Sequence, residues 1–202
     1  MHINICLLTK NKAISVTTLH TIMNMNMICM ANSNFNLEVS FVQDKQSALK
    51  NMKKCDRLVF FDYGTSVDNE TIKTFISDFP DGYKVLIAPC VLEGVDWNQF
   101  KKKTLEGSNE PVYQRGLKFD TTILPTNKPI GDFVSSTTDG RVFAIDTKPV
   151  LKKIREDGFK SFEHLKNSGV KIGVLRTSTV TCHYVYESIG NIIESLGIRT
   201  GP

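Results

Sequence analysis

Several patterns that are common in nucleotide-binding enzymes and hydrolases are missing from this chain of 202 residues. No Gly-x-Gly-x-x-Gly follows the first apolar run and there is no Walker-type Gly/Lys loop, which argues against the usual dehydrogenase and P-loop sites. The absence of a Gly-x-Ser-x-Gly elbow disfavours an α/β-hydrolase. No stretch approaches the roughly 20 apolar residues of a membrane-spanning helix. We therefore expect a soluble protein with no integral membrane segment.

Paired cysteines and dense charge are also scarce. The five cysteines are spread from Cys6 to Cys182, and their odd number and wide spacing fit neither a disulfide framework nor a zinc ribbon. Reduced thiols in the cytoplasm are the simpler interpretation. The net charge is only +4, and the densest basic run is Lys101–Lys103. A nucleic-acid partner is not expected, because such proteins gather more positive charge in one patch, whereas a mild excess suits a small anionic ligand.

Apolar patterns typical of strands and helices alternate through the first half of the chain. Strands are expected over residues 3–8, 37–42, 57–61 and 84–88, and helices over 15–31, 46–54, 68–78 and 97–104. This alternation predicts βαβ units and a parallel sheet. Ligands of such sheets bind at the carboxyl ends of the strands, so the residues that follow each strand are the first candidates for a site.

The second half of the chain is less regular. Residues 105–129 are punctuated by Gly, Pro and Asn, and they predict one strand at most, over 119–124. Further strands are expected over residues 141–145 and 170–175, and helices over 148–155, 159–166 and 184–196.

The most informative segment runs from residue 45 to residue 64. An Ala/Lys/Asn-rich helix leads into an apolar strand, and the strand delivers Asp62 in the sequence Asp-Tyr-Gly. Later in the chain, Asp-Gly leads into the strand at 141–145, and Val-Thr-Cys leads to His183. In this order the segments resemble the nucleotide-sugar-dependent glycosyltransferases of the GT-A fold, whose pattern is an Arg/Lys-Asn helix and then an apolar strand ending in Asp-x-Asp. The resemblance covers most of the chain.

The resemblance implies a fold and an activity. The expected fold is α/β and Rossmann-like, with a mixed central sheet whose parallel N-terminal half is flanked by helices. We expect a single domain over residues 1–202, with a nucleotide-binding half at 1–90 and an acceptor-side half at 91–202. The implied reaction moves a sugar from a UDP- or GDP-linked nucleotide-sugar to a glycan or glycoprotein acceptor.

The resemblance also implies roles for individual residues. Because the leaving nucleoside diphosphate concentrates negative charge, such enzymes use Mn²⁺ or Mg²⁺ to neutralise it, and Asp62 and His183 are the expected ligands. A carboxylate that activates the acceptor hydroxyl is needed in an inverting reaction, and the candidates are Asp157 and Asp139. The expected nucleotide-binding residues are Thr9, Lys10, Asp44, Lys50, Asn51, Asp62 and Tyr63.

Other interpretations stay open. Gly64 stands where the family has its second Asp, so the chain could be a catalytically inactive protein that binds a nucleotide or glycan. Another Rossmann-like class, such as a nucleotidyltransferase, would also suit the alternating pattern. Locally, the segment from Asp62 to Gly64 could be a simple turn, Asp44 could be a helix cap, and His183 could be a structural histidine.

Overall fold

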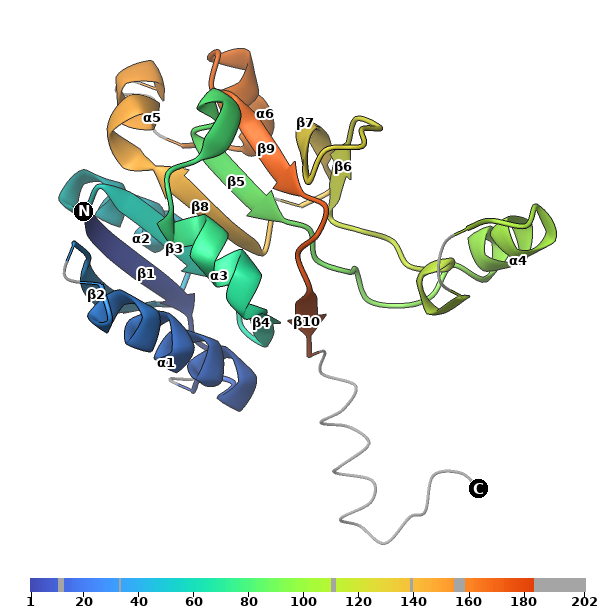
Figure 1. Cartoon of the computed structure of the whole chain (residues 1–202), viewed down its shortest axis with the longest axis horizontal. Coiled ribbons are helices and arrows are strands. Elements are labelled where there is room, and N and C mark those ends of the chain that lie inside the picture. Colours follow the sequence, from blue (N-terminus) through green and yellow to red (C-terminus); the bar gives the residue numbers. More distant parts are fainter. Residues whose placement is uncertain (11–12, 33, 110–111, 139, 155–158, 184–202) are drawn as a thin grey trace, which may run out of the picture.

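The structure is a computed structural model that describes residues 1–10, 13–32, 34–109, 112–138, 140–154 and 159–183. Within these residues, eight strands form one sheet in the order β2-β1-β3-β8-β5-β9-β7-β6, and β4 and β10 form a separate two-stranded ribbon (Figure 1). The strands are β1 (His2–Leu8), β2 (Asn36–Val42), β3 (Arg57–Phe61), β4 (Thr65–Val67), β5 (Val85–Ala88), β6 (Thr121–Ile123), β7 (Ile130–Ser136), β8 (Val142–Asp146), β9 (Ile172–Leu175) and β10 (Val180–Cys182). The α-helices are α1 (Val16–Met30), α2 (Lys45–Lys50), α3 (Asn69–Ile76), α4 (Trp97–Leu105), α5 (Thr147–Ile154) and α6 (Phe162–Asn167), and short 3₁₀ turns span Asn51–Lys54, Pro80–Gly82 and Val112–Gln114.

The expected mixed α/β sheet is confirmed. Strand β1 pairs in parallel with β2 and β3, and Leu7 lies opposite Phe61, so β1 and β3 end at the same edge of the sheet. Strand β5 runs in the same direction, because β8 is antiparallel to both β3 and β5. Strand β9 is parallel to β5. The carboxyl ends of β1, β3, β5 and β9 therefore share one edge, which we call the ligand edge.

The place of β8 could not be read from the sequence. The strand expected over residues 141–145 exists, but it lies between β3 and β5 and runs against both. Strand β7 was not expected at all, and the helix expected over residues 184–196 lies outside the described residues. Both halves of the chain thus contribute strands to the middle of one sheet.

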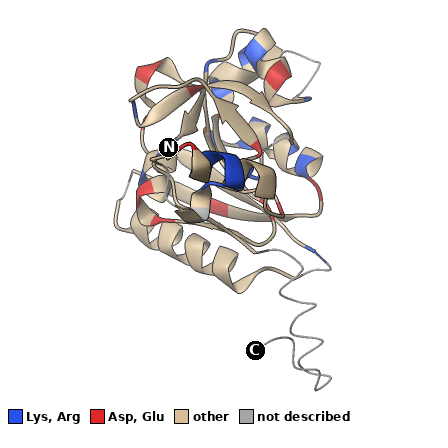
Figure 2. Cartoon of the chain, turned by 90° about the vertical axis from the view of Figure 1, so that its right-hand side faces the viewer, with Lys and Arg blue, Asp and Glu red and all other residues tan. Residues whose placement is uncertain are grey.

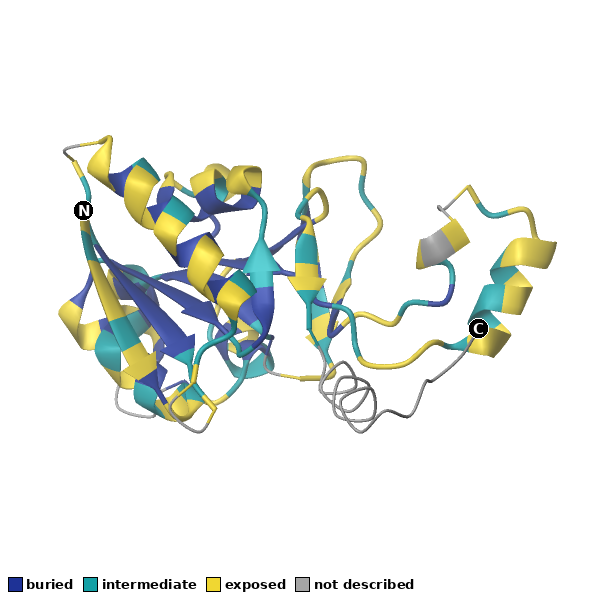
Figure 3. Cartoon of the chain, turned by 90° about the horizontal axis from the view of Figure 1, so that it is seen from below, coloured by how far each residue is buried: buried dark blue, intermediate teal, exposed yellow. Residues whose placement is uncertain are grey.

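Helices cover the sheet on both faces. One core contains buried side chains of α1 and α3, including Met25 and Phe75, and the other contains side chains of α2, α5 and α6, including Leu49 and Phe162. Every residue of β3, β5 and β9 is buried (Figure 3). Burial on both faces explains why these strands appear in the sequence as continuous apolar runs.

The amino end of β3 is fixed by a buried arginine. The guanidinium of Arg57 donates hydrogen bonds to the carboxylate of Asp146 at 2.8 Å and to the carbonyl oxygens of Phe75 and Ser77 at 2.6 and 2.8 Å. Its side chain is 2% exposed. Burial lowers the pKa of Arg57, and the neighbouring Asp146 raises it again. This network lies at the opposite end of β3 from the ligand edge, so its role is structural.

The segment between β5 and β6 leaves the sheet and carries α4 (Figure 1). Helix α4, all of which is described, buries none of its residues, and its basic residues include Lys101 and Lys102, both exposed (Figure 2). This agrees with a solvated basic face. Among the described residues, no helix is both long and apolar enough to cross a membrane.

Candidate functional site

A tight turn after β3 forms the centre of the ligand edge. The amide of Thr65 donates to the carbonyl oxygen of Asp62 at 3.2 Å, which closes the turn, and the Thr65 hydroxyl donates to the same oxygen at 2.7 Å. Gly64 has a φ of +73°, in the left-handed region that favours glycine. The interpretation of this segment as a turn is therefore confirmed, and the turn presents Asp62 and Tyr63 at the end of the strand.

A close backbone contact with His183, which directly follows β10, also requires glycine at position 64. The amide of His183 donates to the carbonyl oxygen of Gly64 at 2.8 Å, so His183 does lie beside the turn. A Cβ atom on Gly64 would lie 2.7 Å from the carbonyl oxygen of His183. This close approach of two backbones gives a structural reason for glycine at the position where the resembling family has its second Asp.

Arg141 holds the carboxylate of Asp62 in place. The Nε atom of Arg141 donates to Oδ2 of Asp62 at 2.7 Å, and its Nη2 atom donates to the carbonyl oxygen of Tyr63 at 3.2 Å. Oδ1 of Asp62 accepts from the Tyr63 amide at 2.7 Å. The side chains of Arg141 and Asp62 are 16% and 22% exposed, so the pair is largely shielded from water.

Sequence reasoning gave Arg141 no role, although it is the first residue of an expected strand and directly precedes β8. Phe61 lies opposite Val142 in the β3–β8 pair, and the Asp62 amide donates to the Arg141 carbonyl oxygen at 2.8 Å. The register of this antiparallel pair brings the arginine to the carboxylate. Without knowledge that β8 lies beside β3, the pattern gave no signal for the contact.

The expected metal ligands do not form a ready metal site. Both carboxylate oxygens of Asp62 already accept hydrogen bonds, one of them from a guanidinium. In the part of the chain that the structure describes, no group of three or more His, Cys, Asp or Glu side chains is arranged to hold a metal ion. The donor set near Asp62 therefore does not fit a cation held by the protein alone.

Two other expected binding residues follow β1 at the same edge. The amide and hydroxyl of Thr9 both donate to the carbonyl oxygen of Val42, at 2.9 and 3.2 Å, which ties the end of β1 to the end of β2. The Nζ atom of Lys10 lies 5.3 Å from the centroid of the Tyr63 ring. The structure thus brings Lys10, Tyr63 and Asp62 together.

The remaining candidates are placed differently. Asp44 caps α2, because its two carboxylate oxygens accept from the amide and hydroxyl of Ser47 at 2.7 and 2.8 Å, and these bonds lower the pKa of Asp44. The helix-cap interpretation is therefore confirmed. Lys50 ends the same helix, and the Asn51 amide group donates to the thiol of Cys6 at 3.5 Å, so neither is brought to Asp62. Asp139 and Asp157 lie outside the described residues.

Lys45 follows the strand expected over residues 37–42, and the sequence analysis gave it no role of its own. Its ammonium group donates to the carbonyl oxygen of Gly140 at 2.7 Å and lies 5.5 and 5.8 Å from the ring centroids of Phe60 and Phe143. It therefore ties the start of α2 to the residue that precedes Arg141. Its position directly after the cap residue Asp44 was the only sequence signal for this role.

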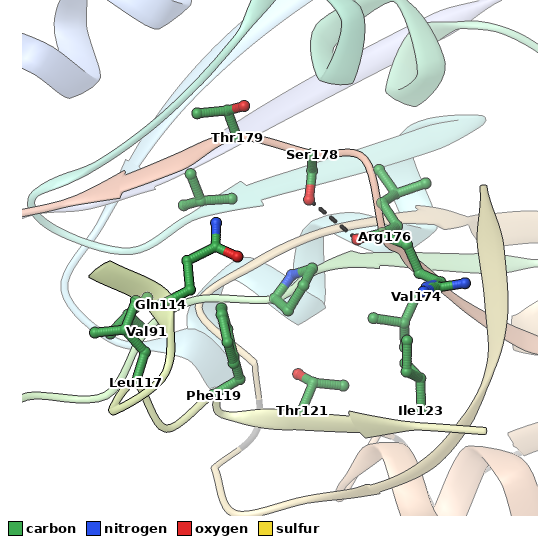
Figure 4. A pocket seen from close by; sticks show the side chains of 13 residues that line it. Val91, Gln114, Leu117, Phe119, Thr121, Ile123, Val174, Arg176, Ser178 and Thr179 are labelled. Carbon is green, nitrogen blue, oxygen red and sulfur yellow. Dashed lines mark hydrogen bonds between the residues drawn. The ribbon is translucent and has the colours of Figure 1, made fainter. Parts of the chain in front are cut away.

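A pocket of about 510 Å³ lies beyond the ends of β5 and β9 (Figure 4). Its walls are mostly apolar, and side chains from the segment between β5 and β6 face the end of β9 and the residues that follow it. Arg176 lies in its wall and, among the described residues, has no carboxylate partner. The hydroxyl of Ser178 is turned to the Leu175 carbonyl oxygen, at 3.1 Å. The lining residues are Pro89, Val91, Gln114, Leu117, Phe119, Thr121, Ile123, Val174, Leu175, Arg176, Ser178, Thr179 and Val180.

The pocket has the size and character of a small-molecule site. Ligand pockets commonly enclose about 300–1,000 Å³ and combine apolar walls with a few polar groups. It lies at the carboxyl ends of the strands, where ligands of open α/β sheets bind. The sequence gave little indication of it, because five of its thirteen lining residues come from residues 114–123, where only one strand was expected.

Comparison with known proteins agrees with this architecture. No family model matches the chain, and no curated protein matches it in sequence. The structure of A197 from STIV is similar with a TM-score of 0.51 and 13% identity, covering 91% of this chain and 86% of that chain. The structure of HddC from Yersinia pseudotuberculosis complexed with GMP-PN is similar with a TM-score of 0.50 and 10% identity, covering 96% of this chain and 99% of that chain. At these identities the similarity shows a shared fold.

Proposed function

We propose that the chain is a transferase that moves a sugar from a UDP- or GDP-linked nucleotide-sugar to a glycan or glycoprotein acceptor. The observation that carries the proposal is the ligand edge itself, where a fixed carboxylate, a lysine and an aromatic ring lie together on the sheet that also borders a pocket of about 510 Å³. The fold similarity to HddC, whose structure is complexed with GMP-PN, supports a nucleotide as one of the ligands.

In this proposal Asp62 binds the ribose and Lys10 faces the diphosphate. Asp62 is held by Arg141 in a single orientation, so its carboxylate is prepared to accept hydrogen bonds from ribose hydroxyls without further ordering. Lys10 is exposed and stands over the Tyr63 ring, where its charge offsets the negative charge of the phosphates. Because Asp62 is already paired, we assign no step to a metal ion.

The acceptor belongs in the pocket beyond β5 and β9. Its wall combines the ring of Phe119 with the polar side chains of Gln114 and Thr121. Apolar walls stack against the C–H faces of a sugar, and a few polar groups fix its orientation. Residues 114–123 belong to the half of the chain, 91–202, that the sequence analysis expects to face the acceptor.

Arg176 favours a second candidate function. A guanidinium without a carboxylate partner in the described pocket wall is suited to a phosphate, which a neutral glycan does not carry. In a nucleotidyltransferase, which joins a nucleoside triphosphate to a sugar phosphate, the Arg176 guanidinium would bind the phosphate of the sugar. The two reactions differ in their products, because one releases a nucleoside diphosphate and the other releases pyrophosphate.

Nucleotide binding is tested first by thermal shift with UDP, GDP and their sugar-linked forms. At a concentration of 100 times Kd, a ligand that binds only the folded protein stabilises it by about 2.7 kcal/mol, or roughly 5–10 °C in Tm. Asp62→Asn should remove this shift. Asp81→Asn is the matched control, because it deletes the same charge at an exposed turn and its φ of +54° suits asparagine. A nucleotide shift that survives Asp62→Asn in a folded protein contradicts the assigned site.

The reaction is tested by its products. Release of a nucleoside diphosphate from a nucleotide-sugar supports the first function, and release of pyrophosphate from a nucleoside triphosphate and a sugar 1-phosphate supports the second. Arg176→Gln should weaken binding of the sugar phosphate and leave binding of a neutral sugar unchanged. Nucleotide binding with neither product indicates a non-catalytic binding protein.

A further inference from the structure

Helix α1 exposes an uncharged, apolar stripe. None of its 15 residues is Lys, Arg, Asp or Glu. The inner side of the helix is already packed, because Ile22, Met25 and Cys29 are buried in the core that α1 shares with α3. On the other side, five large apolar residues at spacings of three and four are 41–81% exposed, and that spacing aligns them along the helix. These five residues are Val16, Leu19, Met23, Met27 and Met30.

The stripe is turned to the open edge of the sheet. The Thr21 hydroxyl accepts from the Val67 amide of β4 at 3.3 Å, so this flank of α1 faces β4. Strand β4 follows β3, on the inner side of β1, whereas β2 lies on the outer side of β1 (Figure 1). Leu19 and Met23 are each two positions from Thr21, so they point nearly the opposite way around the helix. Their flank of α1 is therefore the one on the side of β2.

Strand β2 adds two exposed side chains beside the stripe. Leu37 is packed against the core that contains the buried residues of α1. Because side chains alternate along a strand, Val39 and Phe41 lie on the same face of the sheet as Leu37. They are 36% and 64% exposed. The face that α1 covers is thus continued by apolar side chains to the last strand.

The backbone of β2 is also open along this edge. In the described part of the chain, β2 pairs with β1 alone. The Asn36 amide and the Val42 carbonyl oxygen form hydrogen bonds to the residues that flank β1. Backbone groups alternate in direction along a strand, so those of Leu37, Val39 and Phe41 point away from β1. Such an edge is a template for pairing with another strand.

The outer face, meaning the five stripe residues with Val39 and Phe41, has the size of one side of a protein interface. Its exposed side chains amount to roughly 800 Å², at about 200 Å² for a whole large side chain. One partner in a standard interface buries about 800 Å², whereas the largest apolar patch of a monomer is usually about 300–600 Å². Helices that bind membranes carry Lys or Arg beside their apolar side, and α1 carries neither. An identical copy brings the same uncharged helix and the same open strand, so it fits both without like-charge repulsion.

We propose that the outer face joins two copies of the chain about a two-fold axis beside Val39. The two β2 strands pair antiparallel, with Val39 opposite Val39 of the second copy and Leu37 opposite Phe41 of the second copy. In this register the outward amides and carbonyl oxygens of each copy meet those of the other. The inference does not rest on the proposed transferase activity, so the two can fail separately.

The same axis brings the two copies of α1 together on one side of the joined sheet. Helix α1 runs back along β2, rising about 1.5 Å per residue against about 3.3 Å per residue for the strand. Seven residues back from Met30 therefore cover about the same length as three residues forward from Asn36. This places Met23 level with Val39, close to the axis and facing Met23 of the second copy.

The test is sedimentation equilibrium of the purified full chain over a range of concentrations up to about 50 µM. We expect a mass of twice 22.7 kDa that falls toward the single mass on dilution. A single mass at every concentration would overturn the proposal. Binding of the monomer to vesicles of neutral phospholipid would overturn it as well, because the outer face would then take a membrane.

Variants locate the interface. Met23→Glu and Met23→Lys should each raise the Kd of the dimer at least about tenfold, because each places like charges across the axis, and an equal mixture of the two should dimerise again. Val39→Pro should also weaken the dimer, since it removes an outward amide and no bond to β1. Leu105→Glu is the matched control, because Leu105 is 78% exposed on α4, which leaves the sheet.

Circular dichroism confirms that each variant is folded before its mass is measured. If Val39→Pro does not fold, the two Met23 variants and their mixture give the answer. A dimer whose Kd is the same in the unaltered chain and in both Met23 variants uses another surface and contradicts the proposal. So does a loss of the dimer in Leu105→Glu.

Discussion

Gly64→Asp would introduce the second acidic residue of the Asp-x-Asp pattern found in the family that the chain resembles, yet we expect it to destabilise the fold. A side chain at a φ of +73° costs about 1 kcal/mol in backbone strain. The new Cβ would lie 2.7 Å from the His183 carbonyl oxygen. Because the contact is with a backbone atom, a change of side-chain rotamer cannot relieve it. The β4–β10 ribbon must therefore shift, at a further cost of about 1–3 kcal/mol. The expected loss is about 2–4 kcal/mol in the free energy of unfolding.

The comparison that isolates the close contact uses alanine. Gly64→Ala should lose about 2–4 kcal/mol, whereas Gly82→Ala should lose only about 1 kcal/mol. Gly82 has a similar φ of +77°, but its Cβ would meet nothing within 4 Å. Urea unfolding at 25 °C followed by far-ultraviolet circular dichroism measures both. Equal losses for the two variants would refute the argument that the His183 backbone excludes a side chain from position 64.

Two further predictions concern other fixed points of the fold. Arg57→Met should reduce the free energy of unfolding by about 3 kcal/mol or more in the same urea assay. The reason is that the Asp146 carboxylate and the Phe75 and Ser77 carbonyl oxygens lose their donor. A loss below about 1 kcal/mol would show that water replaces the guanidinium. Burial raises the pKa of Asp68, but the hydrogen bonds from the amides of Thr71 and Thr179 outweigh it, so the pKa is lowered overall. The ionised carboxylate therefore stabilises the fold at pH values above the usual aspartate pKa, and this contribution is lost as the pH falls below about 4. Asp68→Asn should remove the part of the pH dependence of the free energy of unfolding between pH 5 and pH 2 that comes from about one ionisable group. An unchanged pH profile in the variant would contradict this.

The sequence was most informative where local pattern decides the structure. Strands β1, β3 and β5 were expected nearly at their observed bounds, because burial on both faces leaves unbroken apolar runs such as Leu58–Phe61. Strand β2, in which only Val42 is buried, was also expected nearly at its observed bounds. The interpretation of Asp44 as a helix cap also came from local pattern, and its carboxylate accepts from the Ser47 amide three residues ahead. Local patterns thus predicted the first half of the fold and the position of Asp62 at its edge.

Contacts between distant segments could not be predicted. Arg141 meets Asp62 only because β8 pairs with β3, and His183 meets Gly64 only because β10 pairs with β4. A single sequence carries no record of such pairings. Asn51 shows the same limit in reverse, because the family resemblance implied a nucleotide contact whereas its side-chain amide donates to the thiol of the buried Cys6.

The position of β8 also bears on how the chain can acquire its structure during synthesis. Strands β3 and β5 are both complete by residue 88, but the strand that joins them ends at residue 146. At ribosomal rates of about 5–20 residues per second, roughly 3–12 s pass before the joining strand exists. During that interval the facing edges of β3 and β5 have unpaired backbone groups, which are open to pairing with other chains. We therefore expect the nascent chain to depend on protection of these two edges, and a fragment that ends near residue 90 to associate with itself instead of folding as a nucleotide-binding half.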